Sequence, residues 1–451
     1  MSNRIAASTE GTINGGLAVG LSGALAESGG LWFGWDGSIA DDDNYNVEHR
    51  GNIEFVTISL NAEDHQHYYN GYSNRVLWPI CHDLPKFMHF EAGNLTGYRR
   101  VNAQFAKRLA SLLRPEDVVW VHDYHLIPLA TELRRQGVCN PIGFFLHVPF
   151  PNPTTLQSVP GRNYLLDCLC AYDVIGFQTG ADLASFRGAL AGRATAFSVP
   201  FTDVYPIGVD VAGIQHLAKQ HANAKEVQRL TRGLDKRKLA IGVDRLDYSK
   251  GLTPRLVGYE RLQERHPAIL EALVLTQIAI PTRTGLPEYA HTRAEVEQAA
   301  ARINARFGES GFAQIRYLNQ GINRPSLMGL FRRAAIGLVT PIRDGMNLVA
   351  KEYLAAQDRN DPGVLVLSKL AGAVHELNQA VVIDPLDPDD VADGIAAALK
   401  MPMDERRQRH ADMLVTLRKN DITAWRRRFV DALVRHHQLK SRQRGAITSI
   451  G

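Results

Sequence analysis

The sequence lacks several features that would assign it to a specialised class of protein. No run approaches the roughly 20 apolar residues that span a bilayer, and the opening residues, MSNRIAASTEG, lack the apolar core of a signal peptide. The net charge is only +4, so the composition does not indicate nucleic acid as a partner. We therefore expect a soluble, cytoplasmic protein with no membrane or nucleic-acid partner.

Cysteine is also scarce, with only four residues: Cys81, Cys139, Cys168 and Cys170. Their spacing matches neither a paired zinc site nor a small disulfide framework. Cys168 and Cys170 lie in the apolar run LLDCLC, which predicts small core residues with reduced thiols. We expect neither a metal ion nor any other cofactor.

Short β-rich runs alternate with amphipathic helical stretches through most of the chain. The runs are apolar throughout, as in strands that are buried on both faces of a parallel sheet. The predicted strands cover residues 118–122, 142–148, 174–179, 238–243, 273–280, 335–340 and 364–368. This alternation predicts an α/β fold with doubly wound sheets.

The chain, with its 451 residues, is too long for one compact core, and two domains of roughly 200 residues are expected. The boundary is predicted near YPIGVD, so that domains 1–208 and 209–420 face each other across a cleft. A basic C-terminal helix, 421–451, is expected to pack back across the domains. Its apolar residues recur at near-helical spacing: Trp425, Phe429 and Leu433.

Ligands of open parallel sheets bind at the carboxyl ends of the strands, so the residues that follow each strand are the candidates for chemistry. Arg245 and Lys250 follow the predicted strand 238–243 on a short loop. Two cations at a strand end suit a diphosphate, because hydrogen bonds between charged groups are strong. The alternative is a pair of solvated surface cations with Asp244 and Asp247 as their partners.

The segment GLVTPIRDGMNLVAKEYLAAQ predicts a strand, a loop that carries Asp344, and then a helix. The first amides of that helix, at Leu348 and Val349, would point at an anion. Glu352 lies about one turn further on, where its carboxylate could accept hydrogen bonds from ribose hydroxyls. Alternatively, Asp344 is only a turn residue and Glu352 only an acid of the first helical turn.

Two further groups of residues are weaker candidates. Gly15 and Gly16 precede an apolar helical pattern, and with Arg4 they could hold a phosphate or simply form a tight turn. Asp123 and His147 each follow an apolar strand, although His147 could equally be a core histidine. A metal site that combines Asp123 with its neighbouring histidines is disfavoured, because the spacing fits no metal-ligand set.

Taken together, the motifs resemble trehalose-6-phosphate synthases over nearly the whole chain and in that family's order. The segments are GGLAVGL, GLWFGW, YYNGYSNRVLWP, HDYHL, GFFLHVPFP, DVIGFQT, YPIGVD, RLDYSKGL, RINARFG, YLNQ, TPIRDGMNLVAKE and NDITAW. The resemblance implies two Rossmann-like domains of the GT-B type with the active site in the cleft between them. It also implies a metal-independent, retaining transfer of glucose from a nucleotide-glucose to glucose 6-phosphate.

The resemblance assigns roles to individual residues. The acceptor-binding residues would be Arg4, Tyr69, Trp78, Asp123 and Arg283, with the two arginines on the phosphate. The donor-binding residues would be Gly15, Gly16, His147, Arg245, Lys250, Ile322, Asp344, Leu348, Val349 and Glu352. The catalytic set would be Asp123, His147, Arg245, Lys250 and Asp344. The family is thought to use same-face attack, in which the leaving phosphate oxygen accepts the proton of the acceptor.

Three departures from the family pattern leave alternatives open. The chain opens at MSNR where relatives have an apolar strand, so a first strand of only a few residues is expected. Segments 80–94 and 191–203 are unusual and could alter the acceptor side, as in a pseudo-glycosyltransferase that couples a cyclitol nucleotide to an amino-cyclitol phosphate. A catalytically silent sugar-phosphate sensor is the other alternative. Ile322, at the expected base-contacting position, does not decide among UDP-, GDP- and ADP-glucose, although UDP-glucose is expected. The family also suggests a homo-oligomer, which the sequence itself does not indicate.

Overall fold

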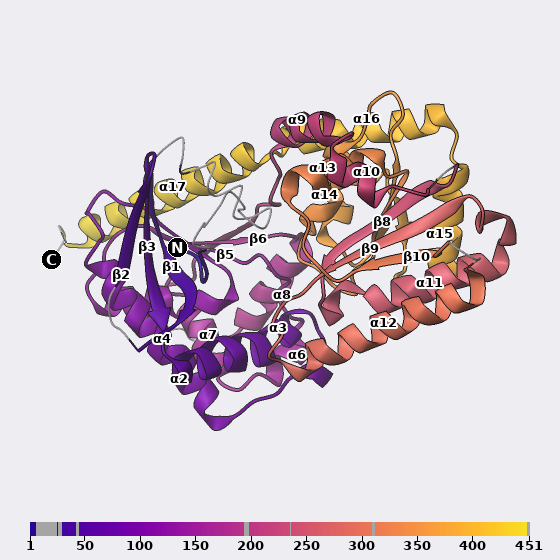
Figure 1. Ribbon diagram of the computed structural model, residues 1–451. Coiled ribbons are helices and arrows are strands. Elements are labelled where there is room, and N and C mark those ends of the chain that lie inside the picture. The colour runs from indigo at the N-terminus through magenta and orange to yellow at the C-terminus, as the bar shows by residue number, and fades with distance from the viewer. Residues whose placement is uncertain are drawn as a thin grey trace. The chain divides into compact units, whose positions relative to one another are not determined.

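A computed structural model describes most of the chain, and Figure 1 shows its helices and strands. The described residues are 1–5, 25, 29–41, 45–193, 198–234, 236–308 and 312–448, with side chains up to residue 439. The chain forms two compact units. Unit 1 comprises residues 1–207 and 423–451, and unit 2 comprises residues 208–422.

Unit 1 contains a four-stranded parallel sheet in the order β4-β5-β6-β7. The strands are β4 (Val119–His122), β5 (Ile142–Phe145), β6 (Val174–Phe177) and β7 (Phe201–Val204). The first three confirm strands predicted from the apolar runs. These runs are apolar throughout because the strands are buried, and in β5 and β6 every residue is buried. Strand β7 was not predicted, since its sequence FTDV is short and partly polar.

A second, three-stranded sheet of unit 1 has the order β1-β3-β2. Strands β1 (Gly30–Ile39) and β3 (Ile53–Leu60) pair in parallel, and β2 (Tyr45–Arg50) pairs with β3 in antiparallel fashion. Residues Met1–Ile5 lie between the two sheets of unit 1. Ser2 bridges to β4 and Arg4 bridges to β1, both in parallel. The opening residues therefore take the place of a strand that joins the two sheets.

The helices of unit 1 connect its strands and include one unusual segment. Segment η1 is π-helical, a form that is rare and is often found at functional sites. The helical segments are α2 (Ala62–Asp64), η1 (His65–Leu77), α3 (Trp78–Cys81), η2 (Pro85–Phe87), α4 (Ala92–Ala110), η3 (Tyr124–Leu126), α5 (Leu129–Arg135), α6 (Pro153–Gln157), α7 (Arg162–Leu169) and α8 (Gly180–Leu190).

The C-terminal helix α17 (Ile422–Thr448) packs against the four-stranded sheet of unit 1 (Figure 1). The ring of Phe429 stacks on Trp120 of β4, with ring centroids 4.7 Å apart. A Cβ atom on Gly143 of β5 would lie 2.7 Å from the Phe429 ring and 2.8 Å from Leu433. Glycine at position 143 therefore allows the helix to approach the sheet closely. The three predicted contact residues, Trp425, Phe429 and Leu433, are all buried.

We expect Phe429→Ala to destabilise unit 1 by about 3–5 kcal/mol, because it removes a fully buried ring from the contact between α17 and the sheet. Denaturant unfolding of the whole chain measures the change. Val415→Ala, at a position that is 66% exposed on helix α16 (Met403–Lys419), serves as the control and should be nearly neutral. Equal stability of the two variants would contradict this account of α17.

Unit 2 is built on a six-stranded, wholly parallel sheet in the order β10-β9-β8-β11-β12-β13. The strands are β8 (Lys238–Arg245), β9 (Leu273–Ile280), β10 (Ile315–Leu318), β11 (Ile336–Val339), β12 (Val364–Ser368) and β13 (Val381–Ile383). The chain winds outward from β8 to β10, then returns to β11 beside β8 and winds the other way. This doubly wound order, which the sequence predicts, makes the carboxyl ends of β8 and β11 the topological switch point where ligands bind.

Helices cover both faces of the unit 2 sheet (Figure 1). Helix α11 packs against α12 and α15, whereas α9, α13 and α14 pack against one another. The segments are α9 (Val211–His221), α10 (Lys225–Leu230), η4 (Tyr248–Lys250), α11 (Leu252–Arg265), η5 (Pro267–Ile269), α12 (Pro287–Phe307), α13 (Arg324–Arg333), α14 (Leu348–Ala356), η6 (Gly372–His375), α15 (Pro388–Lys400) and α16 (Met403–Lys419). Among the helices in the described ranges, none combines the length and apolar character needed to cross a membrane.

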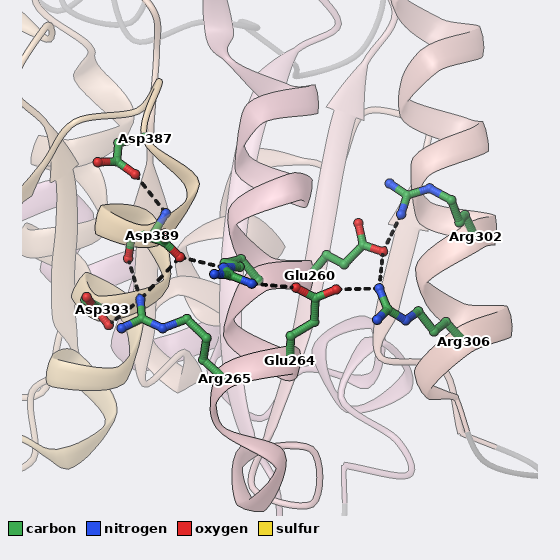
Figure 2. Close-up of polar contacts among 9 residues, drawn as sticks. Glu260, Glu264, Arg265, Arg302, Arg306, Asp387, Asp389 and Asp393 are labelled. Atoms are coloured by element: carbon green, nitrogen blue, oxygen red, sulfur yellow. Dashed lines mark hydrogen bonds and ion pairs between the residues drawn. The ribbon is translucent and has the colours of Figure 1, made fainter.

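Ion pairs join α11 to both of its neighbours, as Figure 2 shows. On one side, Arg265 contacts Asp389 at 3.4 Å and Asp393 at 2.9 Å, both on α15. On the other side, Arg306 of α12 contacts Glu264 at 2.5 Å. Because these groups are partly exposed, each ion pair contributes little to the stability of the protein.

Candidate active site

The loop that follows β8 turns sharply and carries Lys250 back toward the end of β11. Asp247 caps the turn, because its Oδ1 accepts hydrogen bonds from the N–H of Ser249 at 2.9 Å and from the Ser249 hydroxyl at 2.8 Å. Gly251 follows with a φ of +64°, and a Cβ atom there would lie 2.1 Å from the carbonyl oxygen of Thr340. The turn therefore needs a glycine at this position. Arg245, the last residue of β8, is exposed.

Lys250 and Asp344 form an ion pair that joins the loops after β8 and β11. The Nζ atom donates to Oδ2 at 2.5 Å, and the side chains are only 10% and 13% exposed. Asp344 also accepts from the Nδ2 of Asn347 at 3.0 Å. Its backbone N–H donates to the carbonyl of Leu370 at 3.2 Å. The structure thus brings two predicted site residues together at the switch point and fixes their geometry.

The alternative of a solvated cation is wrong for Lys250, whereas it stays open for the exposed Arg245. Asp247 pairs with Arg283 at 2.8 Å, and Asp244 pairs with the buried Arg255 at 2.7 Å. Lys250 is therefore paired with Asp344 rather than with Asp244 or Asp247, and it is buried rather than solvated. The lysine charge stays favourable in this setting because an opposite charge lies beside it.

Helix α14 begins at the predicted place, directly after Asn347. This residue has a φ of +75°, and its side chain accepts from the N–H of Ala350 at 3.2 Å. Leu348 and Val349 form the start of the first turn, and both are half-buried. Backbone N–H groups in a first turn point along the helix axis and have no carbonyl partner within the helix. The start of α14 therefore offers an anion both hydrogen-bond donors and the positive end of the helix dipole.

Glu352 lies further along α14 and is buried, with 5% of its surface exposed. Its Oε1 accepts from the Nη1 of Arg324 at 2.6 Å. Arg324 is the first residue of α13 and comes two residues after the half-buried Ile322. The pair thus connects the carboxylate predicted for ribose with the segment predicted for the base. Sequence reasoning missed Arg324, because a basic residue at a helix start gives no local signal.

Arg283 belongs to unit 2, in the loop after β9, and has a φ of +46°. Its Nη1 donates to Asp247 at 2.8 Å and to the hydroxyl of Tyr289 at 2.7 Å. Arg4, its predicted partner on one phosphate, belongs to unit 1. Their shared role on one phosphate stays a prediction from the family resemblance.

In unit 1, Asp123 and His147 come together at the carboxyl ends of β4 and β5. Asp123 has a φ of +76°, and its N–H donates to the carbonyl of Phe145 at 2.8 Å. Its Oδ1 accepts from the N–H of His147 at 3.3 Å. A non-glycine residue with this backbone conformation is uncommon, and such strain is concentrated at functional sites.

The His147 ring is half-buried and contacts a second histidine. Its Nε2 lies 3.1 Å from the Nδ1 of His122, so one of the two nitrogens donates a hydrogen bond to the other. Burial lowers the pKa of His147 to about 3 and also lowers the pKa of His122 well below its usual value. Both rings are therefore neutral near pH 7. His147 packs against core rings, as a core histidine would. Part of its surface is nevertheless accessible, as a donor-binding residue requires.

The remaining acceptor-side residues lie near an aromatic cluster of unit 1. The Tyr69 ring lies 5.1 Å from Trp35 and stacks on His125 at 6.0 Å. The Arg4 guanidinium lies over the Trp35 ring at 5.6 Å. Trp78 is 3% exposed, and its ring lies 4.1 Å from that of His82. Gly15 and Gly16 lie outside the described residues. Trp35 thus contacts both Tyr69 and Arg4. It was not itself predicted as a site residue, although it lies in the motif GLWFGW.

We expect His147→Gln to make the free energy of unfolding less dependent on pH. With a folded-state pKa of about 3, His147 stays neutral while the unfolded chain gains a proton below about pH 6.5. The contribution of the neutral ring to the free energy of unfolding is fully present above that pH and is lost as the pH falls from about 6.5 toward 3. One such proton changes stability by about 1.4 kcal/mol per pH unit.

Denaturant unfolding of parent and variant at about pH 7.5 and about pH 5 measures this slope. His291→Gln, at a histidine whose side chain is 74% exposed, is the matched control and should keep the parental slope. A parental slope in the His147 variant would contradict the assigned burial.

The chain is similar to known proteins over most of its length. The sequence profile of glycosyltransferase family 20 matches residues 6–435. Trehalose-6-phosphate synthase of Klebsiella pneumoniae is 46% identical over 464 aligned residues, which cover 100% of this chain and 98% of that protein.

Solved structures agree closely with this fold. A UDP-forming alpha,alpha-trehalose-phosphate synthase from Burkholderia xenovorans, in complex with glucose-6-phosphate, has a TM-score of 0.93 at 44% identity and covers 96% of this chain and 98% of its own. A structure described as trehalose-6-phosphate from E. coli bound with UDP-2-fluoro glucose has a TM-score of 0.89 at 43% identity, with 96% and 99% coverage.

Proposed function

The chain belongs to glycosyltransferase family 20, and from this premise we propose that it transfers glucose from UDP-glucose to glucose 6-phosphate. The products are α,α-trehalose 6-phosphate and UDP, with retention at the anomeric carbon. The observation that carries the proposal is the pairing of Lys250 with Asp344 beside the start of α14, at the switch point of the unit 2 sheet.

The donor diphosphate is assigned to the positive groups at this switch point. Negative charge develops on the leaving diphosphate as the glycosyl–phosphate bond breaks. Arg245, Lys250 and the amides of Leu348 and Val349 are fixed positive groups that can stabilise this charge without reorganising. An anion that approaches Lys250 shares the ammonium with Asp344, because the two side chains are already in contact.

The rest of the donor is assigned to the neighbouring polar side chains. Glu352 accepts from the ribose hydroxyls while Arg324 holds one of its oxygens, and Ile322 lies by the base. Asp344 and His147 bind hydroxyls of the donor glucose. A neutral imidazole suits a sugar hydroxyl, because it can donate or accept a hydrogen bond without introducing a charge.

The acceptor is assigned to residues of both units. Arg4 and Arg283 bind its phosphate, because a guanidinium matches the geometry of phosphate oxygens. Tyr69, Trp78 and Asp123 line the site of its sugar ring. Of these residues, Arg283 belongs to unit 2 and the other four belong to unit 1.

The transfer proceeds by attack on the same face of the donor sugar that the diphosphate leaves. The acceptor hydroxyl bonds to the anomeric carbon, the bond to the phosphate oxygen breaks, and that oxygen takes the hydroxyl proton. Retaining glycosidases use a carboxylate nucleophile instead. Asp344 is engaged by Lys250 and Asn347, so we assign it to binding rather than to attack. The protein contributes orientation and electrostatic stabilisation.

Product analysis tests this proposal directly. The purified chain is given glucose 6-phosphate with UDP-, GDP- or ADP-glucose and no added metal, and products are identified by mass spectrometry and proton NMR. We expect an α,α-linked disaccharide phosphate, formed fastest from UDP-glucose. Binding of glucose 6-phosphate without product would favour the sensor, and coupling of a cyclitol nucleotide to an amino-cyclitol phosphate would favour the pseudo-glycosyltransferase.

We expect Arg245→Ala and Lys250→Ala each to lower kcat/KM for UDP-glucose by roughly ten-fold or more, because each removes a charged contact to the diphosphate. Initial rates at varied donor concentration measure the loss. Lys369→Ala serves as the control and should keep the parental kcat/KM. Lys369 lies directly after β12, is 52% exposed and pairs with Asp384. Rates within about two-fold of the parent for both site variants would exclude the assigned diphosphate role.

A further inference from the structure

In the sequence, Asp247 lies between Arg245 and Lys250, the two cations assigned to the donor diphosphate. Its side chain is fully buried. Its two carboxylate oxygens serve different partners. Oδ1 accepts from Ser249 twice and closes the turn that carries Lys250, whereas Oδ2 accepts from Arg283. One side chain therefore connects the loop after β8 with the loop after β9.

Arg283 is oriented by this carboxylate. Its side chain is only 5% exposed, and its backbone takes a φ of +46°, which a non-glycine residue keeps only where its surroundings hold it. The Tyr289 hydroxyl reinforces the arrangement, since it accepts from the same Nη1 at 2.7 Å and lies 3.4 Å from Oδ2 of Asp247. Two acceptors therefore hold this guanidinium. The contact to Asp247 is the stronger one, because Asp247 carries a charge and the Tyr289 hydroxyl does not.

We propose that Asp247 is a positioning residue that couples the phosphate-binding arginine of the acceptor site, Arg283, to the donor diphosphate loop. This inference rests on the proposed function. Asp247 touches neither substrate in this role; it fixes Arg283 in place for the acceptor phosphate while the same carboxylate closes the turn behind Lys250. The acceptor-phosphate site and the donor loop are therefore built around one buried charge.

The first test is Asp247→Asn, which keeps the size of the side chain and removes the charge that holds Arg283. Calorimetry measures the Kd of UDP and then the Kd of glucose 6-phosphate at saturating UDP. We expect the Kd of glucose 6-phosphate to rise by roughly ten-fold or more, and to rise further than the Kd of UDP, because a charge-assisted contact to Arg283 is lost.

Two matched variants separate positioning from general damage to the fold. Tyr289→Phe removes the second acceptor for Arg283 and leaves Asp247, so it should weaken glucose 6-phosphate in the same direction by about five-fold. Ser249→Ala removes one hydrogen bond to the other oxygen of Asp247 without touching Arg283, so the Kd of glucose 6-phosphate should stay parental. If Asp247→Asn does not fold, as judged by circular dichroism, Tyr289→Phe carries the test.

The outcomes are distinguishable. A parent protein that binds neither ligand would overturn the proposed function and this inference with it. A parent that binds both ligands, with variants at Asp247 and Tyr289 that weaken UDP and glucose 6-phosphate equally or not at all, would overturn the inference alone. A selective loss of glucose 6-phosphate affinity in both variants supports it.

Discussion

The buried guanidinium of Arg255 holds together the strand ends on which the site of unit 2 depends. Its Nη1 donates to Asp244 of β8 at 2.7 Å and to Gln277 of β9 at 2.8 Å, and its Nε donates to Thr340, directly after β11, at 2.9 Å. A fully buried arginine is tolerated only with an opposite charge beside it, which Asp244 supplies. Arg255 thereby joins three adjacent strands, and the donor residues Arg245, Lys250 and Asp344 lie at or after the carboxyl ends of two of them, β8 and β11.

Much of the fold could be predicted from the pattern of apolar runs. The strands at 273–280 and 364–368 have the predicted bounds, because each is buried on both faces and so leaves an unbroken apolar run. The sheet of β1, β2 and β3 was missed. Every residue of β2, YNVEHR, is exposed or half-buried, so its sequence carries no apolar signal. The π-helical η1 was also missed, since its thirteen residues follow no regular helical period.

The site could be predicted only in part. The rule that ligands bind at strand ends located Lys250 and Asp344 from the sequence, and the structure brings them into contact. The alternative that paired Lys250 with Asp244 was wrong, because α11 places Arg255 beside Asp244 and no local pattern reports a contact between a helix and a strand. The roles of Arg283 and Tyr69 came from the family resemblance alone, because neither residue stands in a pattern that indicates chemistry.

The central claim is that the switch point of the unit 2 sheet binds the donor diphosphate, and a crystal structure of the chain with UDP tests it most directly. The account predicts phosphate oxygens within hydrogen-bond distance of Arg245, of Lys250 Nζ and of the first amides of α14, with the ribose hydroxyls on Glu352. UDP bound to unit 2 away from these groups, with the ion pair of Lys250 and Asp344 untouched, would contradict it.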